Sequence, residues 1–240
     1  MAGATGAIGT PLVTLLLAAG HDVFAMTRDA VKARALDARG AHGIVADAYD
    51  AAGLVAALAA IRPSVVIHQL TDLSGMAVPE AAAATLARNA RLRVEGTRNL
   101  MIAALRSGAT RTIAQSILWT YAPGREPHRE GDPLEAGAAG TRGLTVDGVI
   151  ALERTVSTTA GVTGIIVRYG RLYGPGTGRD DPPAEAPVHV DAAASAARLA
   201  IDHGAAGIYN VAEPNGYADT SKARRELLWD ANFRLDPSAT

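Results

Sequence analysis

Cysteine is absent from the 240 residues of the chain, which excludes disulfide bonds and thiolate sites. Lysine is nearly absent: it occurs at Lys32 and Lys222, and the other 21 of the 23 basic residues are arginine. The formal net charge of −1 argues against nucleic acid or an anionic membrane surface as the main partner. No apolar run reaches the roughly 18 to 20 residues that a transmembrane helix needs. We therefore expect a cytoplasmic globular protein.

Apolar β-branched runs alternate with helical segments along the chain. Two of them, Val65–Ile67 and Ile165–Val167, are continuous, which is typical of strands buried on both faces of a parallel sheet. The alternation predicts one α/β domain over residues 1–240, with a doubly wound parallel sheet of the Rossmann type. The predicted strands are His21–Met26, Gly43–Ala46, Ser64–Leu70, Arg111–Ser116, Gly164–Tyr169 and Ile208–Val211. The predicted helices are Thr10–Ala19, Asp29–Ala38, Leu54–Ala60, Pro79–Ser107, Thr145–Thr158 and Asp191–Asp202.

Three segments lie outside this core: residues 122–144, 171–189 and 212–240. The first two follow strands at the edge of the sheet where such folds bind ligands, and they are rich in Gly, Pro and charge. We expect these segments to form a small substrate-binding region, mainly C-terminal, on the Rossmann core. Because a core of about 150–165 residues leaves little chain for a second lobe, a small molecule is favoured over a nucleotide sugar.

A glycine-rich loop, Gly3-Ala4-Thr5-Gly6-Ala7-Ile8-Gly9, precedes the first predicted helix. Glycines three residues apart let the backbone turn tightly and approach a pyrophosphate, and the helix N-terminus adds free N–H groups and a positive dipole end. Plain glycine-rich turns share this spacing, but the helix and strand that follow favour a phosphate loop. The predicted phosphate contacts are Gly3, Thr5, Gly6, Ala7, Ile8 and Gly9.

Such a loop should follow a buried strand, whereas Met1 and Ala2 are the residues that precede Gly3. We therefore expect the first strand of the sheet to be missing or truncated. A mis-assigned start, in which a valine codon acts as the initiator, is the favoured explanation. A truncated product with an open slot in its sheet is the alternative.

Landmarks over nearly the whole chain resemble the extended and atypical short-chain dehydrogenase/reductases, the NAD-dependent epimerase/dehydratase family. The glycine loop looks like the phosphate loop of that family, and Ala46-Asp47 looks like the strand end whose aspartate holds the adenine. The resemblance implies a nicotinamide dinucleotide cofactor and a homodimer built from two long helices, Pro79–Ser107 and Thr145–Thr158. The other landmarks are Asn89 with Val94–Leu100, Arg168–Gly176, Val188–Asp191, Ile208–Val211 and Ser221–Trp229.

The end of the second strand of such a fold bears on the choice of cofactor. A carboxylate there accepts from the ribose 2′-hydroxyl of NAD and repels the 2′-phosphate of NADP. Here the strand ends in Thr27-Arg28, with Lys32 one helical turn further on. Arg28 can hold a phosphate with two hydrogen bonds; stacking on the adenine or exposure to solvent is the alternative. We expect NADP(H), with NAD(H) as the second choice, and predict that Thr27, Arg28, Asp47, Leu70 and Tyr169 bind it together with the loop.

The residues that perform proton transfer in the resembling family are missing. Those enzymes use a Tyr and a Lys four residues later, together with a Ser or Thr, and the register here places Thr145 and Val149 at the Tyr and Lys positions. No Tyr-x-x-x-Lys occurs in the chain. The remaining candidates are Tyr121 and Ser116 for catalysis and Gln69, Arg171 and Tyr173 for substrate binding; no metal site is predicted.

Three functions fit an intact phosphate loop without the catalytic pair. An NADP(H)-dependent reductase or dehydrogenase of a small carbonyl or hydroxyl metabolite is favoured, with Tyr121 or a water as the proton donor. A non-redox isomerase, dehydratase or cyclase on the same scaffold is the second possibility. A cofactor-binding protein without catalysis is the third.

Overall fold

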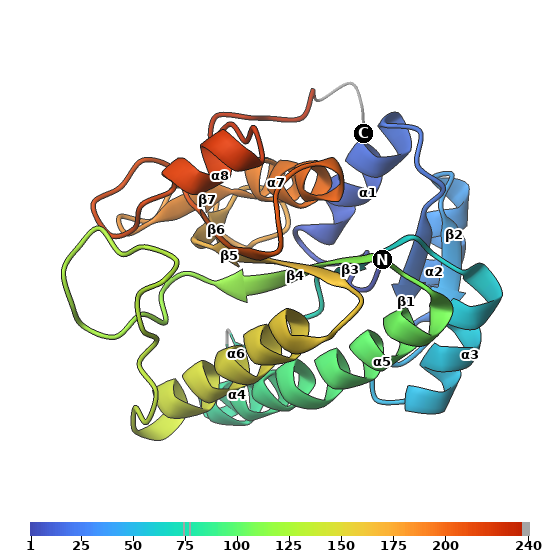
Figure 1. Cartoon of the computed structure of the whole chain (residues 1–240), viewed down its shortest axis with the longest axis horizontal. Helices are drawn as coiled ribbons and strands as arrows, with labels where there is room; N and C mark the ends of the chain where they lie inside the picture. The colour runs from blue at the N-terminus through green and yellow to red at the C-terminus, as the bar shows by residue number, and fades with distance from the viewer. Residues whose placement is uncertain (74, 77, 237–240) are drawn as a thin grey trace.

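The computed structural model describes residues 1–73, 75–76 and 78–236. A parallel sheet lies between two layers of helices (Figure 1). The sheet contains two groups of hydrogen-bonded strands. One group pairs β2 (His42–Val45) with β1 (Phe24–Thr27). The other has the order β3 (Val65–His68), β4 (Arg111–Ile117), β5 (Thr163–Tyr169) and β8 (Gly207–Val211).

Ala2 joins the two groups of strands. It forms parallel bridges to Met26 on β1 and to His68 on β3, and its N–H donates to the Ile67 carbonyl at 2.8 Å. Ala2 therefore occupies, as a short bridge, the central place of the sheet between β1 and β3. The bridge brings Gly3 directly to the carboxyl edge of the sheet, where the glycine loop begins.

Helices cover both faces of the sheet. One layer contains α1 (Gly9–Ala18), α2 (Ala30–Ala38), α7 (Val190–Asp202) and α8 (Ser221–Glu226), and the other contains α3 (Ala51–Ile61), α5 (Thr97–Ser107) and α6 (Gly140–Thr158). Successive strand residues face opposite layers. Ile165 packs in the core under α1 and α7, whereas Ile166 packs against Leu152 of α6. This burial on both faces explains the continuous apolar runs of the sequence.

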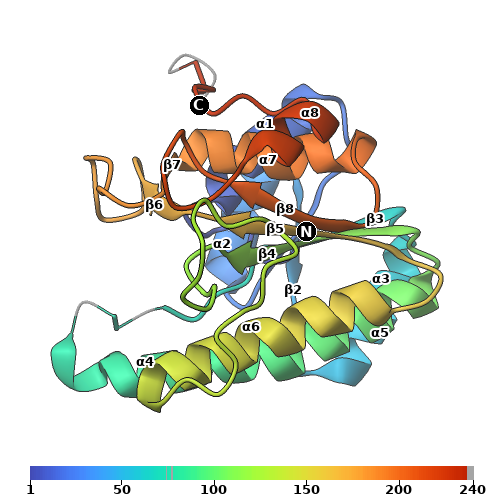
Figure 2. The same ribbon diagram turned by 60° about the vertical axis from the view of Figure 1, so that its left-hand side comes forward.

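The predicted long helix Pro79–Ser107 is a chain of four helical pieces. A 3-10 turn, η1 (Pro79–Ala81), leads into α4 (Ala82–Arg91), a π-turn, η2 (Leu92–Gly96), follows, and α5 continues to Ser107. The segment runs beside α6 under the sheet (Figure 2). α6 itself begins at Gly140, five residues before the predicted start. The π-turn matters for the pocket, because an i→i+5 turn changes the direction of the side chains around it.

The segment 171–189, for which the sequence predicts neither a strand nor a helix, has a short strand at each end. β6 (Arg171–Tyr173) and β7 (Pro187–His189) pair in parallel as a small separate sheet. The pairing brings together two pieces of chain that are far apart in sequence, so short-range patterns could not reveal it. Val188 is fully buried in this sheet, and the small sheet anchors the C-terminal region beside the carboxyl end of β5.

His68, the last residue of β3, is expected to make the fold sensitive to acid. Its Nδ1 accepts from the Leu70 N–H at 3.2 Å, so Nε2 carries the proton and donates to Thr97 Oγ1 at 2.9 Å. The ring is buried, and this burial lowers the pKa of His68 from 6.5 to about 4. In the unfolded chain the ring takes up a proton below pH 6.5, whereas in the folded protein it does so only below about 4.

The free energy of unfolding should therefore fall as the pH drops from 6.5 towards 4, by up to about 3 kcal/mol from this group. His68→Asn keeps an acceptor for the Leu70 N–H and removes the titrating ring. Urea unfolding between pH 4 and 7 should give a flatter stability profile for the variant than for the wild type. Profiles of equal slope would contradict the assignment.

Candidate active site

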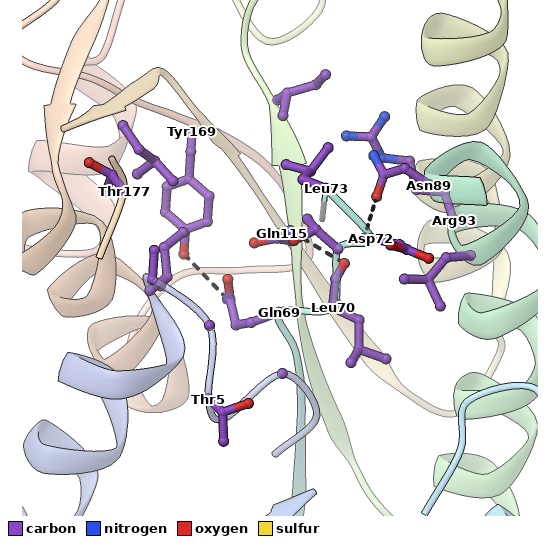
Figure 3. A pocket seen from close by; sticks show the side chains of 18 of the residues that line it. Thr5, Gln69, Leu70, Asp72, Leu73, Asn89, Arg93, Gln115, Tyr169 and Thr177 are labelled. Atoms are coloured by element: carbon purple, nitrogen blue, oxygen red, sulfur yellow. Dashed lines mark hydrogen bonds between the residues drawn. The ribbon is translucent and has the colours of Figure 1, made fainter. Parts of the chain in front are cut away.

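A pocket of about 1020 Å³ opens at the carboxyl edge of the sheet. The glycine loop forms one side of it and the α4–α5 segment forms the other (Figure 3). Strands β1 to β5 each contribute residues that lie at or just beyond their carboxyl ends. The lining includes the predicted cofactor residues Gly3, Thr5, Gly6, Ala7, Ile8, Thr27, Arg28, Asp47, Leu70 and Tyr169, and the predicted site residues Gln69, Ser116 and Arg171.

The three glycines of the loop have different roles. Gly3 has φ +87°, and a Cβ there would lie 2.4 Å from the Gln69 carbonyl oxygen. A Cβ on Gly9 would lie 2.0 Å from the Gly3 carbonyl oxygen, so Gly9 is required by packing inside the loop. A Cβ on Gly6 would meet the Gly3 oxygen at 3.5 Å and otherwise open space. Gly6 is therefore not required by the fold, and the open space beside it suits a phosphate that approaches the backbone closely.

Gly6→Ala is accordingly expected to leave the fold intact and to weaken dinucleotide binding by about tenfold or more, because a methyl group occupies the space of the phosphate. Thermal melting should match the wild type, and calorimetry should show the lost affinity. Gly9→Ala is the contrasting variant, which should lower the melting temperature in the absence of any ligand. Unchanged affinity in Gly6→Ala would place the phosphates elsewhere.

The carboxyl end of β1 carries exposed cations on the pocket wall. Arg28 and Lys32 both line the pocket. The neighbouring acid, Asp29, caps α2: hydrogen bonds from the N–H groups of Lys32 and Val31 lower the pKa of its carboxyl. The Asp29 carboxylate is thus committed to the helix N-terminus. Arg28 and Lys32 are left as exposed, positively charged side chains on this part of the pocket lining.

Gln69 lies between the glycine loop and β5. Its main chain lies beneath Gly3, and its side-chain Nε2 donates to the Tyr169 hydroxyl at 3.4 Å (Figure 3). Its Oε1 is buried and has no partner within the described part of the chain. Leaving such an acceptor unpaired costs about 1–3 kcal/mol, which a donor on a bound ligand offsets. The amide and hydroxyl groups of a nicotinamide riboside are donors of this kind, so Gln69 and the open space at Gly6 together fit a nicotinamide dinucleotide.

The family's catalytic positions carry no proton relay here. Thr145 lines the pocket, but its hydroxyl donates within α6 to the Thr141 carbonyl at 3.0 Å. Val149 is completely buried in the core. Ser116 lines the pocket and donates its hydroxyl proton to Glu153 Oε1 at 2.7 Å. In the register predicted from the sequence, the tyrosine position is thus a threonine that lines the pocket, and the lysine position is a valine buried in the core.

Tyr121, the predicted proton donor, lies behind the pocket wall. The side chain is 2% exposed and belongs to a separate apolar cluster. Its hydroxyl donates to Asn210 Oδ1 at 2.7 Å and accepts from Arg168 at 2.8 Å. Arg168 in turn holds Glu153 with two hydrogen bonds of 2.8 and 2.6 Å. Burial raises the pKa of Tyr121, and both sides of its hydroxyl are occupied, so this geometry favours a structural role over the predicted catalytic one.

The two predicted substrate residues of β6 differ in position. Arg171 lines the pocket but is paired with Glu185 at 2.8 Å. Tyr173 is buried, and its hydroxyl donates to Glu213 Oε1 at 2.6 Å and accepts from Arg234 at 2.9 Å. Tyr173 therefore fastens the C-terminal segment to β6, and its predicted contact with substrate has no support in this geometry.

Sequence reasoning missed the wall opposite the glycine loop. Asn89 and Arg93 of the α4–α5 segment face the pocket, and Asn89 Oδ1 accepts from the Asp72 N–H at 2.9 Å (Figure 3). Gln115 of β4 donates to the Leu70 carbonyl at 3.4 Å beside them. The available signal was that Asn89 and Arg93 are four residues apart, and so lie on one face of a helix.

Among the described residues, no group of three or more His, Asp or Glu side chains is placed to hold a metal ion. No described helix has the length and apolar character needed to cross a bilayer.

The chain is similar to known proteins of one family. Residues 1–188 match the model of the NAD dependent epimerase/dehydratase family. The 3-diazoavenalumate denitrifying reductase of a Streptomyces species is 42% identical over 236 residues, which cover 89% of this chain and 75% of the reductase.

Solved structures of low sequence identity share the fold. The UDP-glucose 4-epimerase of Thermotoga maritima, solved with UDP-glucose, has a TM-score of 0.79 at 16% identity, covering 97% of this chain and 93% of the epimerase. The UDP-glucose 4-epimerase of Brucella ovis, solved with NAD, has a TM-score of 0.77 at 20% identity, covering 96% and 92%. The family match and the related reductase support an enzyme of the NAD(P)-dependent oxidoreductase type. The chain belongs to the NAD-dependent epimerase/dehydratase family.

Proposed function

We propose that the protein is an NADPH-dependent reductase that removes nitrogen from a diazo-substituted carboxylate. The observation that carries the proposal is a pocket lined by the glycine loop in a chain whose sequence contains no Tyr-x-x-x-Lys. A reaction performed here must therefore need no proton from a lysine-activated tyrosine. The name of the 42% identical relative describes a reductase of a diazo compound, and that chemistry meets this requirement.

Different residues of the cleft would bind different parts of the cofactor. The glycine loop would hold the pyrophosphate, Arg28 and Lys32 the 2′-phosphate, and Asp47 the adenosine. Gln69 and Tyr169 lie where the nicotinamide end is expected, and the free Gln69 Oε1 is the acceptor there. When bound, the reduced nicotinamide supplies a hydride.

The stoichiometry of the reaction explains why a proton relay is dispensable. Reduction of a carbonyl adds a hydride to carbon and a proton to oxygen, so the site must supply an acid. The protonated form of a ring diazo compound is a diazonium ion, which carries its own positive charge: one diazonium ion and one hydride give one C–H bond and one molecule of N₂. The carbon–nitrogen bond breaks, the substrate is reduced by two electrons, and no net proton is taken from the protein.

The proposal is tested by comparing two substrates with the same ring. Purified protein and NADPH are incubated with a 3-diazo derivative of 4-hydroxycinnamate or with 4-hydroxycinnamaldehyde. Nicotinamide absorbance reports oxidation, and mass spectrometry reports replacement of the two nitrogens by hydrogen. We expect NADPH consumption and nitrogen loss with the diazo acid alone. NADPH oxidation with the aldehyde alone would indicate a carbonyl reductase instead. Turnover of the diazo acid without NADPH would indicate a non-redox enzyme.

We also propose a homodimer through the α4–α5 segment and α6. Large apolar side chains are exposed to solvent on these helices. They are Val94, Ile102, Leu105 and Leu144, with exposed fractions of 39 to 50%. Burying them against a second copy in a four-helix arrangement would remove this apolar area from water. Sedimentation at micromolar concentration should show a dimer that Leu105→Asp dissociates; a monomeric wild type would contradict the proposal.

A further inference from the structure

Arg93 is an arginine buried in the wall of the pocket. It lies on the π-turn η2, and its side chain is 6% exposed. The residues of η2 that are buried are Leu92, Arg93 and Gly96. In Figure 3, Arg93 lies beside Asn89, opposite the glycine loop. A charged side chain at this depth needs either a partner in the protein or a ligand.

The protein supplies little for this guanidinium to bind. It carries five N–H donors, and its hydrogen bond to the Thr145 carbonyl is long, at 3.5 Å. Within the described ranges, no carboxylate forms an ion pair with it at 4.0 Å or less. Burial lowers the pKa of Arg93 to about 10, so the side chain remains positively charged at neutral pH.

The nearest buried acid is committed to another arginine. Glu153 attracts Arg93 at longer range, but its carboxylate oxygens bind Arg168 and Ser116. The buried group of Arg93, Glu153 and Arg168 therefore has a formal charge of +1. Excess positive charge in a region of low dielectric favours the binding of an anion. The single excess charge here would be neutralised by one carboxylate.

The position of Arg93 indicates which ligand supplies that anion. Its long hydrogen bond reaches Thr145, and Ser116 lies on the same pocket wall. These are the positions where the family carries its reacting groups, whereas the phosphate loop and Arg28 lie at the other end of the cleft. Arg171, another arginine that lines the pocket, is already paired with Glu185.

The geometry points to Arg93 as the residue that binds the carboxylate of the substrate, a small aromatic acid, and orients the reducible end of the ring towards the nicotinamide. That the bound acid is the substrate rests on the proposed function. The binding of an aromatic carboxylate at Arg93 can be measured without any reaction. Bidentate hydrogen bonds between a guanidinium and a carboxylate fix both position and orientation.

The test measures binding of an unreactive probe in the presence of NADP⁺. Calorimetry compares 4-hydroxycinnamate with its methyl ester, which has the same ring and lacks the negative charge. Arg93→Met removes the charge and keeps a similar chain length. Arg98→Met is the matched control, because Arg98 is exposed on α5, one turn further along the same helical segment.

We expect the wild type and Arg98→Met to bind the acid at least about tenfold more tightly than the ester. Arg93→Met should bind the acid about 10- to 100-fold more weakly than the wild type and lose the preference over the ester. Arg93→Lys, which keeps the charge without the planar fork, should keep part of the preference, and it serves if Arg93→Met fails to fold.

Equal binding of acid and ester by the wild type, or an unchanged preference in folded Arg93→Met, would overturn the assignment. Loss of the preference in Arg98→Met as well would overturn it too, since a general loss of positive charge would then be the cause. Binding of the acid through Arg93 without any reduction of a diazo compound would refute the proposed reaction but would still support the carboxylate site.

Discussion

Arg28→Asp is expected to weaken NADPH binding by about 100-fold or more and to change NADH binding much less. The substitution removes a guanidinium that can bind a phosphate with two charge-assisted hydrogen bonds, and it places a like charge beside that phosphate. NADH has a ribose hydroxyl at this point, for which the new carboxylate is an acceptor. Isothermal calorimetry with both cofactors measures the ratio directly.

Arg34→Asp is the control for this experiment. Arg34 is exposed on α2, and the substitution changes the net charge of the protein by the same amount away from the pocket lining. If the two variants lose NADPH affinity equally, the effect is one of general charge. If Arg28→Asp loses both cofactors equally, Arg28 does not discriminate between them, and stacking on the adenine becomes the better explanation.

Glu153→Gln is expected to lower the free energy of unfolding by about 3–5 kcal/mol. The carboxylate is buried, accepts two hydrogen bonds from Arg168, and also accepts the Ser116 hydroxyl. Removing its charge leaves Arg168 and Arg93 as buried cations without an internal counter-charge, which is the costly way to break a buried ion pair. For a chain of this length the melting temperature should fall by on the order of 10 °C.

Tyr121→Phe in the same network separates structure from catalysis. It removes one hydroxyl that bonds Arg168 and Asn210 and keeps the ring. A loss of about 1–3 kcal/mol of stability is expected, with turnover close to that of the wild type. A fall in turnover of about 10²–10⁴ without loss of stability would reinstate Tyr121 as the proton donor. A melting temperature of Glu153→Gln equal to that of the wild type would contradict the account of the network.

The fold was predictable because its main features are local. Continuous runs such as Ile165–Val167 arise from strands covered on both faces, and the glycine loop precedes an apolar helix. What could not be predicted depends on contacts between distant segments. β6 and β7 form only because they meet in space, and the π-turn within the predicted helix Pro79–Ser107 leaves no pattern in the composition.

The sequence predicted which strand ends reach the candidate site, but it could not predict the directions of the side chains there. Gln69 and Ser116 follow or end strands that reach the pocket, and both line it. Tyr121 and Tyr173 also come near strand ends, but the chain turns their hydroxyls towards Asn210 and Glu213. Arg93 was missed because an arginine on a helix is usually solvated, and its burial depends on how α6 packs against η2.

Gln69 connects the phosphate end and the nicotinamide end of the proposed cofactor site, since its main chain lies beneath the first glycine of the loop and its side chain bonds Tyr169. An aromatic acid held by Arg93 would lie in the same pocket, so the two ligands are expected to influence each other's binding. Thermodynamic linkage makes such an effect reciprocal: if the dinucleotide tightens the hold on an aromatic acid by some factor, the acid tightens the hold on the dinucleotide by the same factor. Positive coupling of this kind would appear in calorimetry as one common factor, by which each ligand raises the affinity for the other.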